Sequence, residues 1–294
     1  MSISPPTASP PVVLVFAGTD PTGGAGLQAD ILTLASLGCH PLSVVTAVTV
    51  QDTVGVDDFL PLEPEWIADQ ARCVLEDMPV AAIKIGMIGS VEAVAAIAEV
   101  VSDYPDIPLV LDPVLSSGRG DPLANEELMA ALIDLLLPQT TVLTPNSIEA
   151  RRLAEAFGEE DDAEEDEGDE VGEADRAGAT DLAACARDLI DLGCEFVLIT
   201  GAHEQGAQVV NTLYNTRGVM DRQKWDRLPG AYHGSGCTLA SALAGFLALG
   251  QDVVEAAKEA QAYTWQTLNH AYRPGMGQFI PDRMYWVHGD DDED

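Results

Sequence analysis

Short apolar runs alternate with longer amphipathic segments along most of this chain. Residues 12–17 (VVLVFA) form a continuous apolar run, which is typical of a strand buried on both faces of a parallel sheet. The residues that follow, 27–37, show helical spacing of apolar positions and end at Gly38, where a helix can stop. The same alternation predicts further strands at 43–50, 81–85, 109–111, 141–144 and 196–200, and further helices at 63–78, 91–101, 125–137, 148–157 and 181–192.

The C-terminal part of the chain changes this order. Two antiparallel strands are predicted at 208–214 and 224–228, and two long helices at 237–249 and 253–269. Because strands alternate with helices before that point, the pattern favours right-handed βαβ units. We therefore expect an α/β fold in which a mostly parallel central sheet is covered by helices on both faces.

The chain, 1–294, is predicted to form a single domain with three segments outside its folded core. Residues 1–11 (MSISPPTASPP) are expected to form a flexible leader. Residues 158–178 are polar, highly charged and free of aromatic residues, so we expect a disordered acidic insertion in a connection. Residues 289–294 are expected to form an acidic tail.

The composition is strongly acidic, with 49 acids against 14 bases and a formal net charge of −35. Residues 159–175 carry twelve acids and no base, and lysine occurs only at positions 84, 224 and 258. Two explanations stay open: a well-solvated surface kept soluble by self-repulsion, or a cytoplasm of high salt, where screening makes the charge tolerable. Either explanation argues against a nucleic-acid partner, because phosphate contacts need clustered Lys and Arg.

The chain shows no sign of a membrane or disulfide-rich protein. A membrane-spanning helix needs an apolar run of about 18 residues or more, and no such run occurs, so we expect no membrane association. The five cysteines form no CxxC motif and no disulfide framework. Their odd number fits a reducing compartment, and we expect a cytoplasmic protein.

Small and polar residues follow nearly every predicted strand. In an open α/β sheet, ligands bind just beyond the carboxyl ends of the strands. A single such ending only terminates a strand, since Gly, Pro, Asn and Asp do so everywhere. Several endings together predict a shared crevice, and this chain has them at 18–20 (GTD), 51–52 (QD), 86–87 (GM), 112–113 (DP), 145–146 (PN) and 201 (G).

Cys237 lies in the segment HGSGCTLASALAGFLAL, between a Gly-Ser-Gly turn and a predicted helix. The first amides of a helix have no internal partners, and with the helix dipole they bind phosphate or a developing oxyanion. The dipole is also expected to lower the pKa of the thiol, so that a thiolate could accept a proton from a substrate hydroxyl. The alternative is a small buried cysteine that packs the start of the helix.

Seven segments occur in an order that resembles one family. They are AGTDPTGGAGLQADILTLASLGCH, TAVTVQDTVGV, IKIGMIG, LDPV, LTPNSIEA, ITGAH and YHGSGCTLASALA. Together they resemble the hydroxymethylpyrimidine/phosphomethylpyrimidine kinases of thiamine biosynthesis, in the ribokinase-like superfamily. The resemblance implies a three-layer fold with a sheet of about eight strands. It also implies ATP-dependent phosphorylation of 4-amino-5-hydroxymethyl-2-methylpyrimidine and then of its monophosphate.

The resemblance implies contacts to the substrate. Gln51 matches the residue that hydrogen-bonds the aminopyrimidine, and a side-chain amide offers the donor and acceptor that the ring edge requires. Asp30 matches a carboxylate that binds the amino group or the hydroxymethyl end of the substrate. Without the resemblance, Gln51 would be a polar strand cap and Asp30 an exposed helix acid. Four further positions match residues that line the pocket: Gly18, Ala25, Met87 and Val114.

The resemblance also implies the residues of phosphoryl transfer, which needs charge neutralisation and alignment. Gly234, Ser235 and Gly236 correspond to the family's anion hole, and Cys237 to its catalytic base, a role that Asp holds in many superfamily relatives. No GxxxxGK[ST] phosphate-binding loop occurs in the chain. The anion hole at the start of the predicted helix is therefore expected to bind the phosphates.

Acidic and amide side chains complete the expected nucleotide site. Asp112 and the pair Asn146 and Glu149 resemble residues that organise Mg²⁺ and the phosphates of ATP, and their oxygens suit a hard cation. Glu149 would otherwise only stabilise the first turn of a helix. Thr200 departs from the family, because many members have there a lysine that approaches the ATP phosphates. Mg²⁺, the helix end or another base such as Arg119 must then neutralise that charge.

Two other functions stay open at this point. A kinase of the same fold could act on a related hydroxymethyl ring, chiefly pyridoxal or pyridoxine. A catalytically inactive small-molecule sensor could keep the pocket and lose the transfer. The context of Gln51 argues against the first, and the presence of Cys237, Asp112 and Glu149 argues against the second. The resemblance also implies a homodimer, because relatives commonly dimerise.

Overall fold

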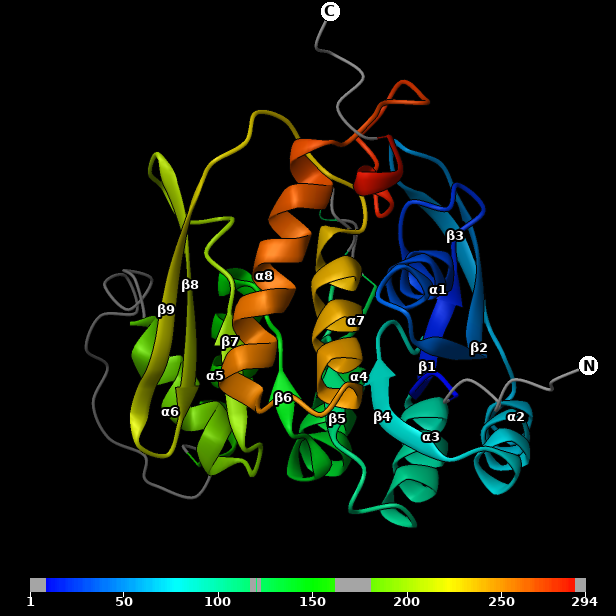
Figure 1. Cartoon of the computed structure of the whole chain (residues 1–294). Coiled ribbons are helices and arrows are strands. Elements are labelled where there is room, and N and C mark those ends of the chain that lie inside the picture. The colour runs from blue at the N-terminus through cyan, green and yellow to red at the C-terminus, as the bar shows by residue number, and fades with distance from the viewer. Residues whose placement is uncertain (1–8, 117–119, 121–122, 162–180, 289–294) are drawn as a thin grey trace, which may run out of the picture.

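The computed structural model describes residues 9–116, 120, 123–161 and 181–288. Within these residues the fold is a nine-stranded sheet in the order β3-β2-β1-β4-β5-β6-β7-β8-β9, with helices on both faces (Figure 1). The strands from β2 to β7 in that order run parallel to one another. Antiparallel strands lie at the edges: β3 pairs with β2 at one edge, and at the other β8 pairs with β7 and β9 pairs with β8. The expected three-layer α/β architecture is confirmed.

The strands are short in the middle of the sheet and longer toward its edges. Their bounds are β1 Val12–Thr19, β2 His40–Gln51, β3 Val56–Pro61, β4 Val80–Ile85, β5 Leu109–Leu111, β6 Val142–Leu143, β7 Phe196–Ile199, β8 Gln208–Asn215 and β9 Gly218–Asp226.

Both faces of the sheet are buried, and β1 shows why its apolar run is continuous. Successive side chains of a strand point to opposite faces. Val12, Leu14 and Phe16 pack in one hydrophobic core, under α2 to α6, while Val13 and Val15 pack in the other, under α1, α7 and α8. The helix bounds are α1 Gly26–Ser36, α2 Pro64–Asp77, α3 Val91–Ser102, α4 Glu126–Ala131, α5 Ser147–Asp161, α6 Leu182–Asp191, α7 Ser235–Ala248 and α8 Val253–Asn269.

Three elements differ from the sequence prediction. The apolar pattern does not predict β3, because its sequence VDDFLP lies at the sheet edge and carries two adjacent acids. Strand β9 begins at Gly218, before the expected start at 224. The helix expected at 125–137 divides into α4, a π-helical turn at Leu132–Leu136 and a 3-10 turn at Leu137–Gln139, where a proline removes one amide donor.

Some predicted features lie wholly or partly outside the described residues. Arg119, most of the acidic insertion, most of the leader and the tail 289–294 belong to this group. Helix α5 continues to Asp161, past residue 158, where the insertion was expected to begin. Across the residues that the structure covers, no helix has the length and apolar character needed to cross a membrane.

Candidate functional site

The carboxyl ends of the parallel strands lie together along the side of the sheet that is drawn uppermost in Figure 1. We call this side the edge of the site, as distinct from the edge strands β3 and β9. Gln51 ends β2, Met87 follows β4 and Asp112 follows β5 directly. The N-terminus of α7 reaches the same edge, because a Cβ added at Gly236 would lie 3.8 Å from Oδ2 of Asp112. The predicted strand endings are thus brought together at the position where α/β sheets bind ligands.

The first turn of α7 leaves backbone amides free. Gly234 caps the helix with φ 78°, a left-handed conformation that glycine adopts without strain. Its carbonyl accepts hydrogen bonds from the amide and the hydroxyl of Thr238, at 2.9 and 2.8 Å. Among the described residues, the amides of Ser235, Gly236 and Cys237 have no acceptor. With the positive end of the helix dipole, these amides form a candidate anion hole.

The thiol of Cys237 lies half-buried beside this anion hole. Burial raises its pKa to about 12, Lys84 opposes this rise, and the carboxylates of Asp30 and Asp112 add to it. A backbone hydrogen bond from Gly26 also lowers the thiol pKa. The expectation of a lowered pKa is therefore wrong for this arrangement, because desolvation and two nearby carboxylates outweigh the favourable neighbours.

Asp30 is buried under the site instead of lining an open pocket. Its side chain has no exposed surface, and both of its oxygens accept hydrogen bonds from Nζ of Lys84 at 3.0 Å. Oγ of Ser241, on α7, donates a third hydrogen bond to Oδ1 at 2.6 Å. The implied substrate contact does not fit this arrangement, because Asp30 already serves as the counter-ion of a buried ammonium group.

Gln51 keeps part of its hydrogen-bonding capacity. Its Nε2 donates to Oγ1 of Thr49 at 2.6 Å, and its side chain is half-buried. Its amide oxygen has no donor among the described residues, so it can accept a hydrogen bond from a ligand. Gly18 lies next to Met87, since a Cβ at Gly18 would be 3.2 Å from the Met87 sulfur. Glycine therefore lets Met87 pack across the end of β1.

Ala25 and Val114 are held by local backbone hydrogen bonds at this edge. Ala25 caps α1 and donates its amide to Oδ2 of Asp20 at 2.7 Å. Val114 follows Asp112 and donates its amide to the Asp112 carbonyl at 2.9 Å. Both side chains are half-buried, so each keeps some surface that a ligand could contact.

Asp112 and Glu149 form a buried acidic pair. Burial raises the pKa of Asp112 to about 6, against the opposing effect of Lys84. Burial and the nearby Asp112 raise the pKa of Glu149 to about 8. It is unfavourable for both carboxylates to be ionised at once. A divalent cation would neutralise both charges, so the pair suits such an ion. The described residues contain no group of three or more His, Cys, Asp or Glu that could hold a metal, so water and phosphate would supply the other ligands.

Glu149 and Asn146 also form a helix cap. Oδ1 of Asn146 accepts the amides of Ile148 and Glu149 at 2.9 and 3.0 Å. Glu149 in turn accepts the Asn146 amide through Oε2 at 2.9 Å, which completes a capping box. Its Oε1 accepts the Leu115 amide at 3.4 Å. The helix-stabilising role considered for Glu149 is thus present, and it fixes the carboxylate close to Asp112.

Thr200 continues β7 and pairs with Asn146 in an isolated parallel bridge. Its carbonyl accepts the Ser147 amide at 3.0 Å, and its side chain is half-buried. An ion pair joins Arg151 of α5, the helix that begins at Ser147, to Glu204 at 2.8 Å. The hydroxyl of Thr200 lies at the same sheet edge as the acidic pair, without the charge that a lysine would supply.

Asp20 is predicted only as part of a strand ending, and Lys84 and Arg283 have no predicted role at this edge. The Asp20 carboxylate accepts hydrogen bonds from Thr22 and Ala25 and contacts Nε2 of His233 at 2.9 Å. Arg283 is buried and donates to the Gly24 carbonyl at 2.6 Å and to Thr238 at 3.1 Å. Lys84 could have been singled out from the sequence, because a lysine inside a predicted buried strand needs a charged or hydrogen-bonding partner.

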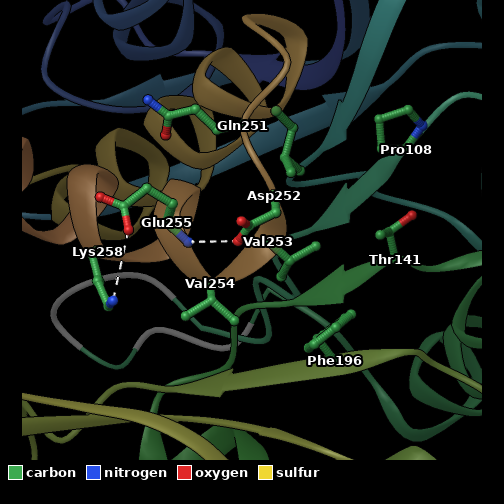
Figure 2. Close-up of a pocket in the computed structure, with 10 residues that line it drawn as sticks. Pro108, Thr141, Phe196, Gln251, Asp252, Val253, Val254, Glu255 and Lys258 are labelled. Carbon is green, nitrogen blue, oxygen red and sulfur yellow. Dashed lines mark hydrogen bonds and ion pairs between the residues drawn. The ribbon is translucent and has the colours of Figure 1, made fainter.

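A separate hollow lies at the opposite end of the sheet. Its volume is about 760 Å³, and Pro108, Thr141 and Phe196 line it from the starts of the strands (Figure 2). The first turn of α8 forms the other wall, where Asp252 caps the Glu255 amide at 3.0 Å. None of the predicted site residues lines this hollow.

Comparison with known families identifies the family to which this chain belongs. The family model described as phosphomethylpyrimidine kinase matches residues 20–282. This chain belongs to that family. It is 37% identical over 281 residues to a hydroxymethylpyrimidine/phosphomethylpyrimidine kinase of Streptomyces coelicolor, covering 94% of this chain and 96% of the relative. It is 34% identical to the Salmonella typhimurium enzyme of the same name, over 91% of this chain and 94% of the relative.

Solved structures agree with the family and with the wider fold. A phosphomethylpyrimidine kinase of Clostridium difficile is 32% identical, with a TM-score of 0.69, over 88% of this chain and 99% of that chain. A pyridoxal kinase of Staphylococcus aureus bound to pyridoxal is 26% identical, with a TM-score of 0.78, over 95% of both chains. The backbone alone therefore does not distinguish pyrimidine kinases from pyridoxal kinases, whereas the sequence relatives and the family model do.

Proposed function

We propose that this chain is an ATP-dependent kinase of thiamine biosynthesis. It phosphorylates 4-amino-5-hydroxymethyl-2-methylpyrimidine and then its monophosphate. One observation carries the proposal: the free amides of α7 face Asp112 at the sheet edge where Gln51 and Met87 also lie. Membership of the phosphomethylpyrimidine kinase family supports it.

Each side chain at the edge has a role in this proposal. Gln51 hydrogen-bonds the amino edge of the pyrimidine ring through its free amide oxygen. Gly18, Ala25, Met87 and Val114 surround the ring. Cys237 faces the hydroxymethyl group and accepts its proton during transfer, which requires the thiolate form.

The transferred phosphoryl group and the other phosphates of ATP bind beside the start of α7 and the acidic pair. Amides of Gly234, Ser235 and Gly236 with the Cys237 amide hold the transferred phosphoryl group, where charge develops on its oxygens. Asn146 and Thr200 contact the phosphates of ATP. Asp112 and Glu149 would hold Mg²⁺, which neutralises phosphate charge when bound.

Incubation with Mg-ATP and hydroxymethylpyrimidine, followed by mass detection of the mono- and diphosphate, tests the proposal. We expect both products from the wild-type protein. Cys237→Ala is expected to lower kcat by roughly 10²–10⁴-fold with little change in KM for the pyrimidine. Normal turnover of this variant would remove the proton-accepting role from Cys237, while the kinase activity itself would stand.

A pyridoxal kinase is the second candidate, because the Staphylococcus aureus structure covers 95% of this chain with a TM-score of 0.78. Coupled assays of ADP release with the pyrimidine and with pyridoxal, side by side, distinguish the two. We expect the higher kcat/KM for the pyrimidine. Tight pyrimidine binding without ADP release would instead indicate a sensor.

We further propose a homodimer that forms through β2 and β3. Val48, Val50 and Leu60 are exposed by 48, 59 and 69%, and Val48 lies opposite Leu60 in the strand pairing. These three side chains share one face and form an apolar patch suited to a protein interface. Light scattering is expected to give a dimer for the wild-type protein and a monomer for Val50→Asp. A monomeric wild-type protein would contradict the proposal.

We also propose a cytoplasmic location. All five cysteines are free thiols, and three of them, Cys39, Cys185 and Cys194, are buried. Free buried thiols are stable in a reducing compartment. Fractionation of cells that express the full chain is expected to recover it with cytoplasmic markers.

A further inference from the structure

A buried charged cluster joins three elements directly beneath the anion hole. Lys84 on β4 has no exposed surface, and its ammonium group lies 3.0 Å from both oxygens of Asp30 on α1. Ser241 on α7 completes the cluster through its hydrogen bond to Asp30 at 2.6 Å. We call Lys84, Asp30 and Ser241 the floor cluster.

The floor cluster reaches the reacting edge of the sheet. A Cβ added at Gly86 would lie 2.6 Å from Nζ of Lys84, so the ammonium group sits where β4 ends and the loop toward Met87 begins. Ser241 follows Cys237 by one helical turn, and residues four apart lie on the same helix face. Cys237 therefore lies above the cluster on α7.

The ammonium group is oriented toward the site. Lys84 acts on the pKa of Cys237 more strongly than the Asp30 carboxylate does, and the same holds for the pKa of Asp112. Because Nζ of Lys84 also lies where β4 ends, the positive end of the ion pair is the end nearer to the thiol and to Asp112. A second buried cation, Arg283, lies at the same edge and donates to the Gly24 carbonyl and to Thr238.

Stability alone gives little reason for this cluster. A buried ion pair is often replaced by well-packed apolar residues without loss of stability, because desolvating two charges costs about as much as their attraction returns. Both charges are fully buried on elements whose other buried residues are mostly apolar. A role in setting the charge and position of the groups above it accounts for their presence at this place.

We propose that Lys84 is a positioning residue for phosphoryl transfer: held by Asp30 and Ser241, its ammonium group fixes α7 against β4 and sets a positive field under Cys237 and the anion hole. The inference rests on the proposed kinase function. It assigns no direct contact with substrate to Lys84, whose ammonium group is enclosed by the protein.

The decisive experiment separates charge from stability. Lys84→Met leaves Asp30 as an uncompensated buried charge, so both Tm and kcat are expected to fall. The double variant Lys84→Met with Asp30→Leu removes both charges and is expected to recover Tm, while kcat stays lower by about tenfold or more and KM for the pyrimidine stays within about twofold. Lys224→Met, on the exposed face of β9, is the matched control and is expected to change neither.

Recovery of both Tm and kcat in the double variant would overturn the proposal, because the pair would then be structural only. If the double variant fails to fold, Ser241→Ala takes its place, since it removes only the hydrogen bond to Asp30. A several-fold fall in kcat at unchanged KM supports the proposal, and an unchanged kcat overturns it.

Alkylation of Cys237 by iodoacetamide gives a readout that needs no turnover. Mass spectrometry follows the Cys237 peptide at a fixed alkaline pH, with the exposed Cys73 as an internal control in the same sample. We expect alkylation of Cys237 to slow several-fold in Lys84→Met while that of Cys73 stays unchanged. Equal rates at Cys237 would overturn the proposal, whereas a wild-type protein without pyrimidine turnover would contradict only the proposed function.

Discussion

At the residue scale, the surroundings of Cys237 set what the thiol can do. With a pKa of about 12 it carries a proton at neutral pH, and a protonated thiol cannot accept a second one. The groups that favour the thiolate are Lys84 and the Gly26 amide, and those that oppose it are burial and the carboxylates of Asp30 and Asp112. Catalysis through this sulfur therefore depends on the fraction that is ionised.

The pH dependence of turnover checks this role. We expect kcat/KM of the wild-type protein to rise between roughly pH 6 and pH 9, because below its pKa the thiolate fraction grows about tenfold per pH unit. Cys237→Asp is expected to flatten the rise, since a carboxylate ionises at lower pH. Cys237→Ser, which does not ionise in this range, should stay low throughout. A flat wild-type profile would contradict the assignment of Cys237 as the proton acceptor.

The acidic pair makes a second prediction at this scale. The pKa of Glu149 in the fold, about 8, lies above its usual value, so the metal-free protein loses stability as pH rises toward 8 and Glu149 must ionise. Mg²⁺ is then expected to raise Tm by a few degrees more at alkaline pH than at mildly acidic pH.

Glu149→Gln is the matched control, because Gln also completes a capping box but has no charge. It is expected to reduce the pH dependence of the Mg²⁺ effect to the part that Asp112 contributes, with its pKa of about 6, while it keeps the helix start intact. Thermal unfolding with Mg²⁺ or with a chelator, at both pH values, measures this. An equal gain from Mg²⁺ at both pH values in the wild-type protein would argue against metal binding at this pair.

At the element scale, two loops from distant parts of the chain pack against each other beside the anion hole. The loop after β1 is held by Asp20, and the start of α7 is held against it through His233 and Arg283. Gly24 and Gly234 meet at the contact, where there is no room for a Cβ on Gly234. The free amides of α7 are thus fixed by packing between elements as well as by the helix itself.

Alanine at Gly234 tests this close approach. Gly234 and Gly250, at the two ends of α7, have φ of 78° and 89°, but a Cβ at Gly250 meets nothing within 4 Å. Gly250→Ala is expected to cost about 1–2 kcal/mol of unfolding free energy and to leave kcat unchanged. Gly234→Ala is expected to cost more and to lower kcat, because its methyl group would overlap the Gly24 carbonyl. Equal effects of the two substitutions would contradict this account.

At the scale of the whole molecule, charge is the unusual property. The net charge of −35 places many acids on the surface, and like charges repel more strongly in the compact state than in the unfolded chain. Salt screens this repulsion over a distance that falls from about 10 Å at 0.1 M to about 3 Å at 1 M. The stability of the folded state should therefore depend on ionic strength.

We expect Tm to rise by several degrees between about 0.1 M and about 2 M KCl, since screening removes the repulsion. Chloride is the appropriate anion, because sulfate also strengthens apolar burial and would confound the result. Calorimetry across a KCl series measures the effect. No gain in Tm would contradict adaptation to high salt and favour the alternative of a merely well-solvated surface.

The sequence by itself determined the local elements and the family. The apolar run of β1, the helix that begins after the Gly-Ser-Gly turn and the polar strand endings follow from side-chain spacing and glycine freedom, which act over a few residues. The ordered motifs identified the phosphomethylpyrimidine kinase family, which the family match confirms. The edge strand β3 escaped prediction because its pairing with β2 supplies the stability that its own pattern lacks.

Only the tertiary structure decided the electrostatics of the site. Lys84 and Asp30 are 54 residues apart, Ser241 and Asp30 are 211 apart, and His233 and Asp20 are 213 apart. Their pairing depends on which strands and helices become neighbours. The spacing of residues along the chain does not show which elements these are. For the same reason the pKa of Cys237 could not be inferred from the helix start alone, because burial and charges from other elements determine it.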